Sequence, residues 1–149
     1  METKLTKRVT LQVGSTVGQM PLSRILCVED EDDIRVVVRL TLQSVGHFTV
    51  RSCASGAEAL AVAEEFAPDL ILLDVMMPTA DGPATLLGLR ALPGLAETPV
   101  VFMTALSDPE DVARLTALGA AGVIAKPFKP MSLPGKIREI WARCGGAPG

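Results

Sequence analysis

The feature that most constrains the fold is a regular alternation of short apolar runs with longer segments of helical spacing. Five runs of strand length, rich in β-branched residues, occupy residues 25–28, 48–51, 70–73, 99–103 and 122–125. Between and after these runs, apolar residues recur every three or four positions, as in amphipathic helices. Strands that alternate with helices are typical of right-handed βαβ units. The chain is therefore predicted to form an α/β doubly wound domain whose parallel sheet is covered on both faces.

The ends of several helical segments carry capping signals. Ser55 is followed by Glu58 at the spacing of a capping box, which predicts a helix start. Ser107 or Asp108 can cap a later helix, and Gly46 suits the C-terminal end of the first. The last helix is predicted to run from about 131 to 144. The buried face of the first helix is predicted to consist of Ile34, Val37, Val38, Thr41, Leu42 and Val45.

Length and composition bound the domain organisation and exclude several functions. The 149 residues suit one domain, expected at 23–145, between a flexible N-terminal extension at 1–22 and a disordered tail at 146–149. A net charge of −3 and the lack of an aromatic-interleaved basic patch argue against direct nucleic-acid binding. No apolar run approaches the roughly 18 residues of a membrane span, so a cytoplasmic protein without membrane attachment is expected. Cys27 and Cys53 lie in apolar stretches and are expected to be buried free thiols.

Polar side chains follow four of the five predicted strands, at the point where each strand ends. Glu29 and Asp30 follow the first strand, Asp74 the third, Thr104 the fourth and Lys126 the fifth. The carboxyl ends of parallel strands meet at one edge of a sheet, where open α/β folds bind their ligands. These five side chains are therefore expected to form one site.

The chemistry of this group is that of a cation site beside a nucleophile. Three converging carboxylates repel one another unless a cation neutralises them, and Mg²⁺ prefers oxygen ligands. The Asp74 carboxylate can attack phosphorus to form an aspartyl phosphate. The Lys126 ammonium and the Thr104 hydroxyl would then hold the phosphoryl oxygens.

Glu29 is the first of five consecutive acidic residues, 29–33. Only the first two are predicted to face the cation. The remaining three begin the first helix, where the helix dipole favours negative charge and where Asp32 can act as the cap.

Four sequence pieces together resemble one known family. "ILCVEDE", "PDLILLDVMMPTADG", "PVVFMTA" and "GAAGVIAKPF" occur at the intervals found in response-regulator receiver domains of two-component signalling. The resemblance covers about residues 23 to 144. It implies a flavodoxin-like (βα)5 fold with the strand order 2-1-3-4-5.

The resemblance also implies roles for the residues at the strand ends. Asp74 would accept a phosphoryl group from a phosphohistidine of a sensor histidine kinase or a histidine phosphotransfer protein. Thr104 and Lys126 would contact that group, and the peptide bond between Lys126 and Pro127 would be cis. Mg²⁺ would be bound by Asp30, Asp74 and the main-chain carbonyl of Met76, with Glu29 acting directly or through water.

The chain departs from the family pattern at several positions. Val123 stands where the family commonly has an aromatic residue that turns inward on activation, so the usual form of that switch is not expected. Met76 and Leu106 are apolar at two positions that control access of the hydrolytic water in the family, which predicts slow dephosphorylation. Glu29 replaces the more usual Asp and puts little in doubt.

Three functions remain open. The favoured one is a stand-alone signalling receiver that is not an enzyme apart from catalysing its own phosphorylation and dephosphorylation. Its changed surface, about 108–144, would bind a protein target or support a homodimer. The second is a degenerate receiver that binds its partner constitutively, which Val123 suggests. The third is a Mg²⁺-dependent phosphohydrolase, but Met76 stands where such an enzyme would need a second carboxylate.

Overall fold

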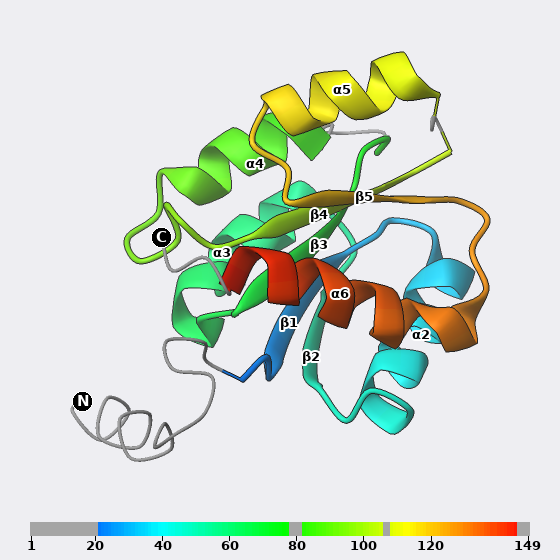
Figure 1. Ribbon diagram of the computed structural model, residues 1–149. Helices are drawn as coiled ribbons and strands as arrows, with labels where there is room; N and C mark the ends of the chain where they lie inside the picture. The colour runs from blue at the N-terminus through cyan, green and yellow to red at the C-terminus, as the bar shows by residue number, and fades with distance from the viewer. Residues whose placement is uncertain (1–20, 78–81, 106–107, 146–149) are drawn as a thin grey trace, which may run out of the picture.

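Five parallel strands form a single sheet in the part of the chain that the computed structural model describes, residues 21–77, 82–105 and 108–145. The strand order is β2-β1-β3-β4-β5, which confirms the predicted fold class and topology (Figure 1). The strands are β1 (Arg24–Val28), β2 (Thr49–Cys53), β3 (Leu70–Asp74), β4 (Val100–Thr104) and β5 (Gly122–Ala125). The helices are α2 (Asp32–Ser44), α3 (Gly56–Phe66), α4 (Gly82–Arg90), α5 (Pro109–Ala117), the short 3₁₀ helix η1 (Pro130–Ser132) and α6 (Leu133–Gly145). None of the described helices is both long and apolar enough to cross a bilayer.

Helices cover both faces of the sheet and make two apolar layers. Side chains of a strand point alternately to opposite faces. In β3, Leu70 and Leu72 therefore pack toward α2 and α6, whereas Ile71 and Leu73 pack toward α3, α4 and α5 (Figure 1). All five residues of β3 are buried, as expected for a central parallel strand.

The buried cysteines belong to these layers. Cys27 lies on the α2 and α6 side of the sheet and Cys53 on the other, and both are buried free thiols as predicted. Burial raises the pKa of Cys27 to about 12 and that of Cys53 to about 11. Both thiols are therefore protonated and unreactive at neutral pH.

Two of the predicted helix caps are confirmed. The Ser55 side chain accepts a hydrogen bond from the Glu58 main-chain N–H at 3.1 Å, and the Glu58 carboxylate accepts one from the Ala54 N–H at 2.9 Å. Asp108 caps α5 by accepting from the Asp111 N–H at 3.0 Å. These contacts satisfy main-chain donors that the first turn of a helix otherwise leaves unpaired.

The start and the buried face of α2 differ from prediction. Glu31 occupies the cap position without a side-chain bond, and Asp32 is the first helical residue, its carboxylate paired with Arg35 instead. The buried stripe contains Val38, Thr41 and Leu42. Val37 and Val45 are 40% and 41% exposed, so they lie outside the buried stripe.

Some element boundaries are also shifted. β2 begins at 49 rather than 48 and continues to Cys53, because main-chain pairing with β1 extends to Val28 opposite Cys53. β4 spans 100–104 rather than 99–103. The segment expected to start the last helix at about 131 is the 3₁₀ turn η1, and α6 itself begins at Leu133.

The start of α4 lies directly against the strand that ends in Asp74. The Gly82 N–H donates to the Val75 carbonyl oxygen at 2.8 Å. A Cβ on Gly82 would lie 2.8 Å from both the Asp74 carbonyl oxygen and the Val75 Cα, so only glycine allows this approach.

We expect Gly82→Ala to destabilise the fold by about 1 to 3 kcal/mol, because main-chain atoms cannot yield to the added methyl group. Gly135→Ala is the matched control: Gly135 lies in α6 with nothing within 4 Å of the added Cβ. That substitution should stabilise the protein by about 0.5 to 1 kcal/mol through helix propensity. Urea unfolding of the three proteins provides the measurement, and equal stability of Gly82→Ala and wild type would contradict the predicted clash.

Candidate functional site

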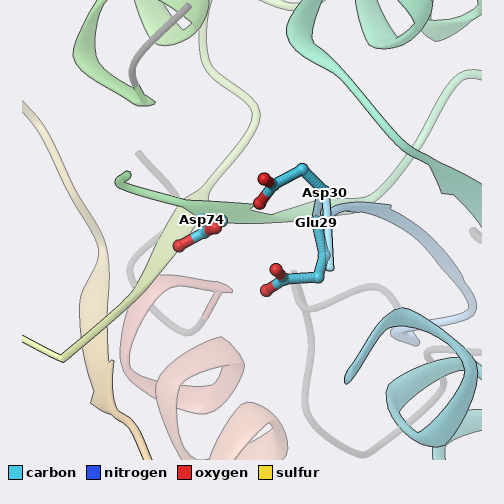
Figure 2. A group of neighbouring side chains, drawn as sticks. All are labelled: Glu29, Asp30 and Asp74. Atoms are coloured by element: carbon cyan, nitrogen blue, oxygen red, sulfur yellow. The ribbon is translucent and has the colours of Figure 1, made fainter. Parts of the chain in front are cut away.

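The structure brings the predicted residues together at the carboxyl edge of the sheet. Glu29 and Asp30 follow β1, Asp74 and Thr104 are the last residues of β3 and β4, and Lys126 follows β5. Glu29, Asp30 and Asp74 each offer a carboxylate oxygen, and these oxygens lie within 4.8 Å of one another. Figure 2 shows Glu29 and Asp30 grouped beside Asp74, which comes from the neighbouring strand. Among the described residues, this is the acidic cluster suited to a hard divalent cation.

Lys126 joins two of these carboxylates. Its Nζ donates to Glu29 Oε1 at 2.9 Å and to Asp74 Oδ1 at 3.3 Å. The side chain is only 14% exposed. Burial alone would lower the pKa of Lys126, but the hydrogen bond and charge of Glu29, followed by those of Asp74, outweigh it and raise the pKa. The ammonium therefore stays charged and offsets part of the negative charge of the cluster.

Asp74 is held in an environment that disfavours its ionised form when no cation is bound. Burial, followed by the negative charge of Glu29, raises the pKa of Asp74 to about 6. Lys126 and the Met76 main-chain N–H, which donates to Asp74 Oδ1 at 3.4 Å, oppose this shift. A divalent cation beside Asp74 would favour the carboxylate, so the donor set fits a magnesium ion.

Glu29 is oriented by protein donors on both of its oxygens. The residue is fully buried. Oε1 accepts from Lys126, and Oε2 accepts from the Glu31 main-chain N–H at 3.0 Å. Each carboxylate oxygen has a second lone pair, so Glu29 can still bind a cation or its water ligand.

The cluster opens into a cleft of about 750 Å³. Met76, on the rim, is 60% exposed. Leu106, which was predicted to control access of the hydrolytic water, lies outside the described residues. The cleft is lined by Asp30, Glu31, Asp74, Val75, Met76, Met77, Pro83, Ala105, Arg114 and Lys126.

Two further expectations concern the fourth and fifth strands. Thr104 is buried at the end of β4, and its main-chain carbonyl accepts from the Lys126 N–H at 2.8 Å, which ties the two strand ends together. The peptide bond between Lys126 and Pro127 is cis, as predicted. Val123 is partly buried and packs against the apolar layer beneath α3, α4 and α5.

Sequence reasoning missed one residue beside the site, Arg35. Its guanidinium contacts the main chain of Glu29 and Asp30 and pairs with Asp32. The spacing of Asp32 and Arg35, three residues apart at the start of a helix, was the available signal, but such a pair normally indicates only a surface contact.

Comparison with known proteins gives a consistent family assignment. The sequence signature of the response regulator receiver domain matches residues 25–138. A probable transcriptional regulator, ycf27, of Porphyridium aerugineum is 37% identical over 124 residues, which are 83% of this chain and 50% of that protein. The DNA-binding response regulator MtrA of Mycolicibacterium paratuberculosis is 36% identical over 125 residues, 84% of this chain and 54% of that protein. The chain thus spans about half the length of the curated relatives it matches.

Two solved structures match this chain over all or nearly all of their own length. The chemotaxis response regulator CheY4 of Vibrio cholerae superimposes with a TM-score of 0.74 at 33% identity, over 80% of this chain and 99% of that one. A putative response regulator from Chloroflexus aurantiacus gives a TM-score of 0.73 at 32% identity, over 83% of this chain and all of the other. With its sheet order and its acidic strand ends, the chain belongs to the response regulator receiver domain family.

Proposed function

We propose that this receiver accepts a phosphoryl group on Asp74 from a phosphohistidine of a sensor kinase or a histidine phosphotransfer protein. The observation that carries the proposal is the position of Asp74 at the cleft. Its carboxylate accepts a hydrogen bond from the Lys126 ammonium and lies within 4.8 Å of a carboxylate oxygen of Glu29 and of Asp30. In the transfer, an Asp74 carboxylate oxygen forms a bond to phosphorus. The bond from phosphorus to the donor imidazole nitrogen breaks, and its electron pair stays with the imidazole.

Asp30, Asp74 and the Met76 carbonyl would hold Mg²⁺, with Glu29 acting directly or through water. Bound there, the ion would neutralise the negative charge that builds up when a phosphoryl group approaches three carboxylates. Asp74 would remain the nucleophile because its carboxylate borders the cleft, whereas both Glu29 oxygens already accept from protein donors.

Lys126 would stabilise the phosphorylated form. Its ammonium already contacts Asp74 at 3.3 Å and would exchange that contact for a phosphoryl oxygen while keeping Glu29 as its second partner. Thr104, at the end of the neighbouring strand, would donate a hydrogen bond from its hydroxyl to the same phosphoryl group.

The output would pass through protein contacts made by the receiver itself. Phosphorylation can shift a two-state equilibrium only as far as it stabilises one state over the other. We propose that the surface from about 108 to 144 carries the change, toward a protein target or a second copy. Because Val123 provides no aromatic ring to turn inward, constitutive partner binding is the second candidate function.

Phosphorylation of the acceptor can be read directly from intact-protein mass. Incubation with a small phosphoramidate donor and Mg²⁺ should add one phosphoryl group to the wild type and none to Asp74→Asn. Asp33→Asn, which removes an exposed acid from the first turn of α2, is the matched control and should be labelled like the wild type. Chelation of Mg²⁺ should abolish labelling. An adduct that survives in Asp74→Asn would contradict the assignment of the acceptor, and partner binding that is unchanged by this substitution would favour constitutive binding.

Without metal, Asp74→Asn should make the protein more stable above pH 6. The folded state raises the pKa of Asp74 from 3.8 to about 6, so at higher pH it must hold an unfavourable carboxylate. The gain for Asn should reach on the order of 1 to 3 kcal/mol at pH 8 and diminish as the pH falls through 6 toward 4, where wild-type Asp74 becomes protonated.

Urea unfolding in the presence of a chelator at pH 8 and at pH 5 measures this difference. Added Mg²⁺ should reverse the order at pH 8, because a ligand stabilises the protein that binds it. A mutant that is no more stable than the wild type at pH 8 without metal would contradict the unfavourable carboxylate.

A further inference from the structure

Arg35 contacts the main chain of the loop that joins β1 to α2. Its Nη1 donates to the main-chain carbonyl of Glu29 at 3.0 Å and to that of Asp30 at 3.4 Å. Its Nη2 pairs with Asp32 Oδ1 at 2.6 Å. The side chain is 20% exposed, whereas that of its partner Asp32 is 83% exposed. The guanidinium therefore faces the loop backbone through Nη1, while the exposed Asp32 carboxylate binds Nη2.

These contacts restrain the two acidic residues from the main-chain side. The carbonyl groups of Glu29 and Asp30 both point to one guanidinium, so the rotation of the intervening peptide unit is restricted. On the opposite side, Glu29 is held through its carboxylate by Lys126 and by the Glu31 N–H. Among the described residues, the Asp30 side chain has no comparable hydrogen bond or ion pair, so its carboxylate depends on the backbone for its orientation.

The same contacts offset part of the negative charge of the acidic run 29–33. The Arg35 guanidinium donates hydrogen bonds to two main-chain carbonyls, and its positive charge offsets that of the Asp32 carboxylate. Planar donors of this kind suit several oxygens at once, which an ammonium group matches poorly.

We propose that Arg35 is a positioning residue for the cation site, holding the backbone of Glu29 and Asp30 so that the Asp30 carboxylate faces Asp74. The inference rests on the proposed function, because it assumes that these carboxylates bind Mg²⁺. Arg35 does not line the cleft, so it would touch neither the cation nor the phosphoryl group.

Charge and positioning predict opposite results for removal of Arg35. The guanidinium is positive and close to a cation site, so if its charge were all that mattered, its removal would strengthen Mg²⁺ binding. If it orients the loop, its removal weakens binding, and loss of a group that orients a metal ligand typically costs about 10-fold or more in affinity.

The test compares Mg²⁺ affinity, measured by calorimetric titration, in the wild type, Arg35→Met, Arg35→Lys and Arg39→Met. Arg39 lies one turn further along α2, and among the described residues its side chain donates to Gln43 Oε1, at 3.5 Å, and not to the loop. Arg39→Met therefore removes the same charge from the same helix without touching the loop. Urea unfolding in chelator, run in parallel, measures the purely structural effect of each change.

Arg35→Met is expected to bind Mg²⁺ about 10-fold more weakly than the wild type, with Arg39→Met unchanged. Arg35→Lys should also bind more weakly, because a single ammonium cannot span two carbonyls and Asp32, and this variant carries the test if Arg35→Met does not fold. At saturating Mg²⁺ the phosphorylation rate of the variants should return to the wild-type value, since the defect lies in cation binding.

Unchanged or tighter binding in both Arg35 variants, with the wild type binding Mg²⁺, would overturn the positioning role and leave the proposed function intact. A loss of stability without a loss of affinity would do the same, because it would assign Arg35 to the fold alone. A wild-type protein that binds no Mg²⁺ would instead overturn the proposed cation site, and the inference with it.

Discussion

The rest of the site depends on the placement of one buried ammonium among carboxylates. Without Lys126, the fully buried Glu29 and the nearly buried Asp74 would face each other as like charges in a poorly solvated space. An unpaired buried charge is strongly destabilising, so loss of Lys126, or of Glu29 as its nearer partner, would affect the fold as well as the chemistry. The end of the neighbouring strand helps to place this side chain. The Lys126 main-chain N–H donates to the Thr104 carbonyl, which fixes the backbone position from which the side chain extends. Correct pairing of the strands is therefore needed to place the ammonium that compensates the two carboxylates.

Much of this arrangement is predictable from sequence because it follows from topology. Once five strands are known to be parallel, the residues after their carboxyl ends must share an edge, which is why Asp74, Thr104 and Lys126 could be grouped in advance. Caps such as Ser55 with Glu58 are local and were predictable for the same reason: the interacting groups are within one turn of each other. The receiver signature matches residues 25–138, a range that includes all three residues.

The parts that were not predictable depend on side-chain directions in three dimensions. Asp32 was predicted to cap the first helix, but its carboxylate pairs with Arg35 instead. An oppositely charged side chain competes with a main-chain N–H for the same carboxylate. Arg35 was not singled out, because sequence spacing does not indicate that a guanidinium contacts two main-chain carbonyl groups of the preceding loop. The width of the buried stripe on α2 was overestimated because periodicity gives a face but not how deeply the helix sits on the sheet.

The alternation of side chains along β3 has a consequence for how the chain tolerates change. All five residues of this strand are buried: the first four divide their side chains between the two apolar layers, and the fifth is Asp74, the proposed acceptor. Deleting one of them would exchange the two layers over the remainder of the strand and at the same time draw Asp74 back from the edge of the sheet. The length of β3 therefore determines the position of Asp74 at the edge of the sheet. We would expect natural variation in chain length to be confined to the connections at the amino ends of the strands, away from Asp74.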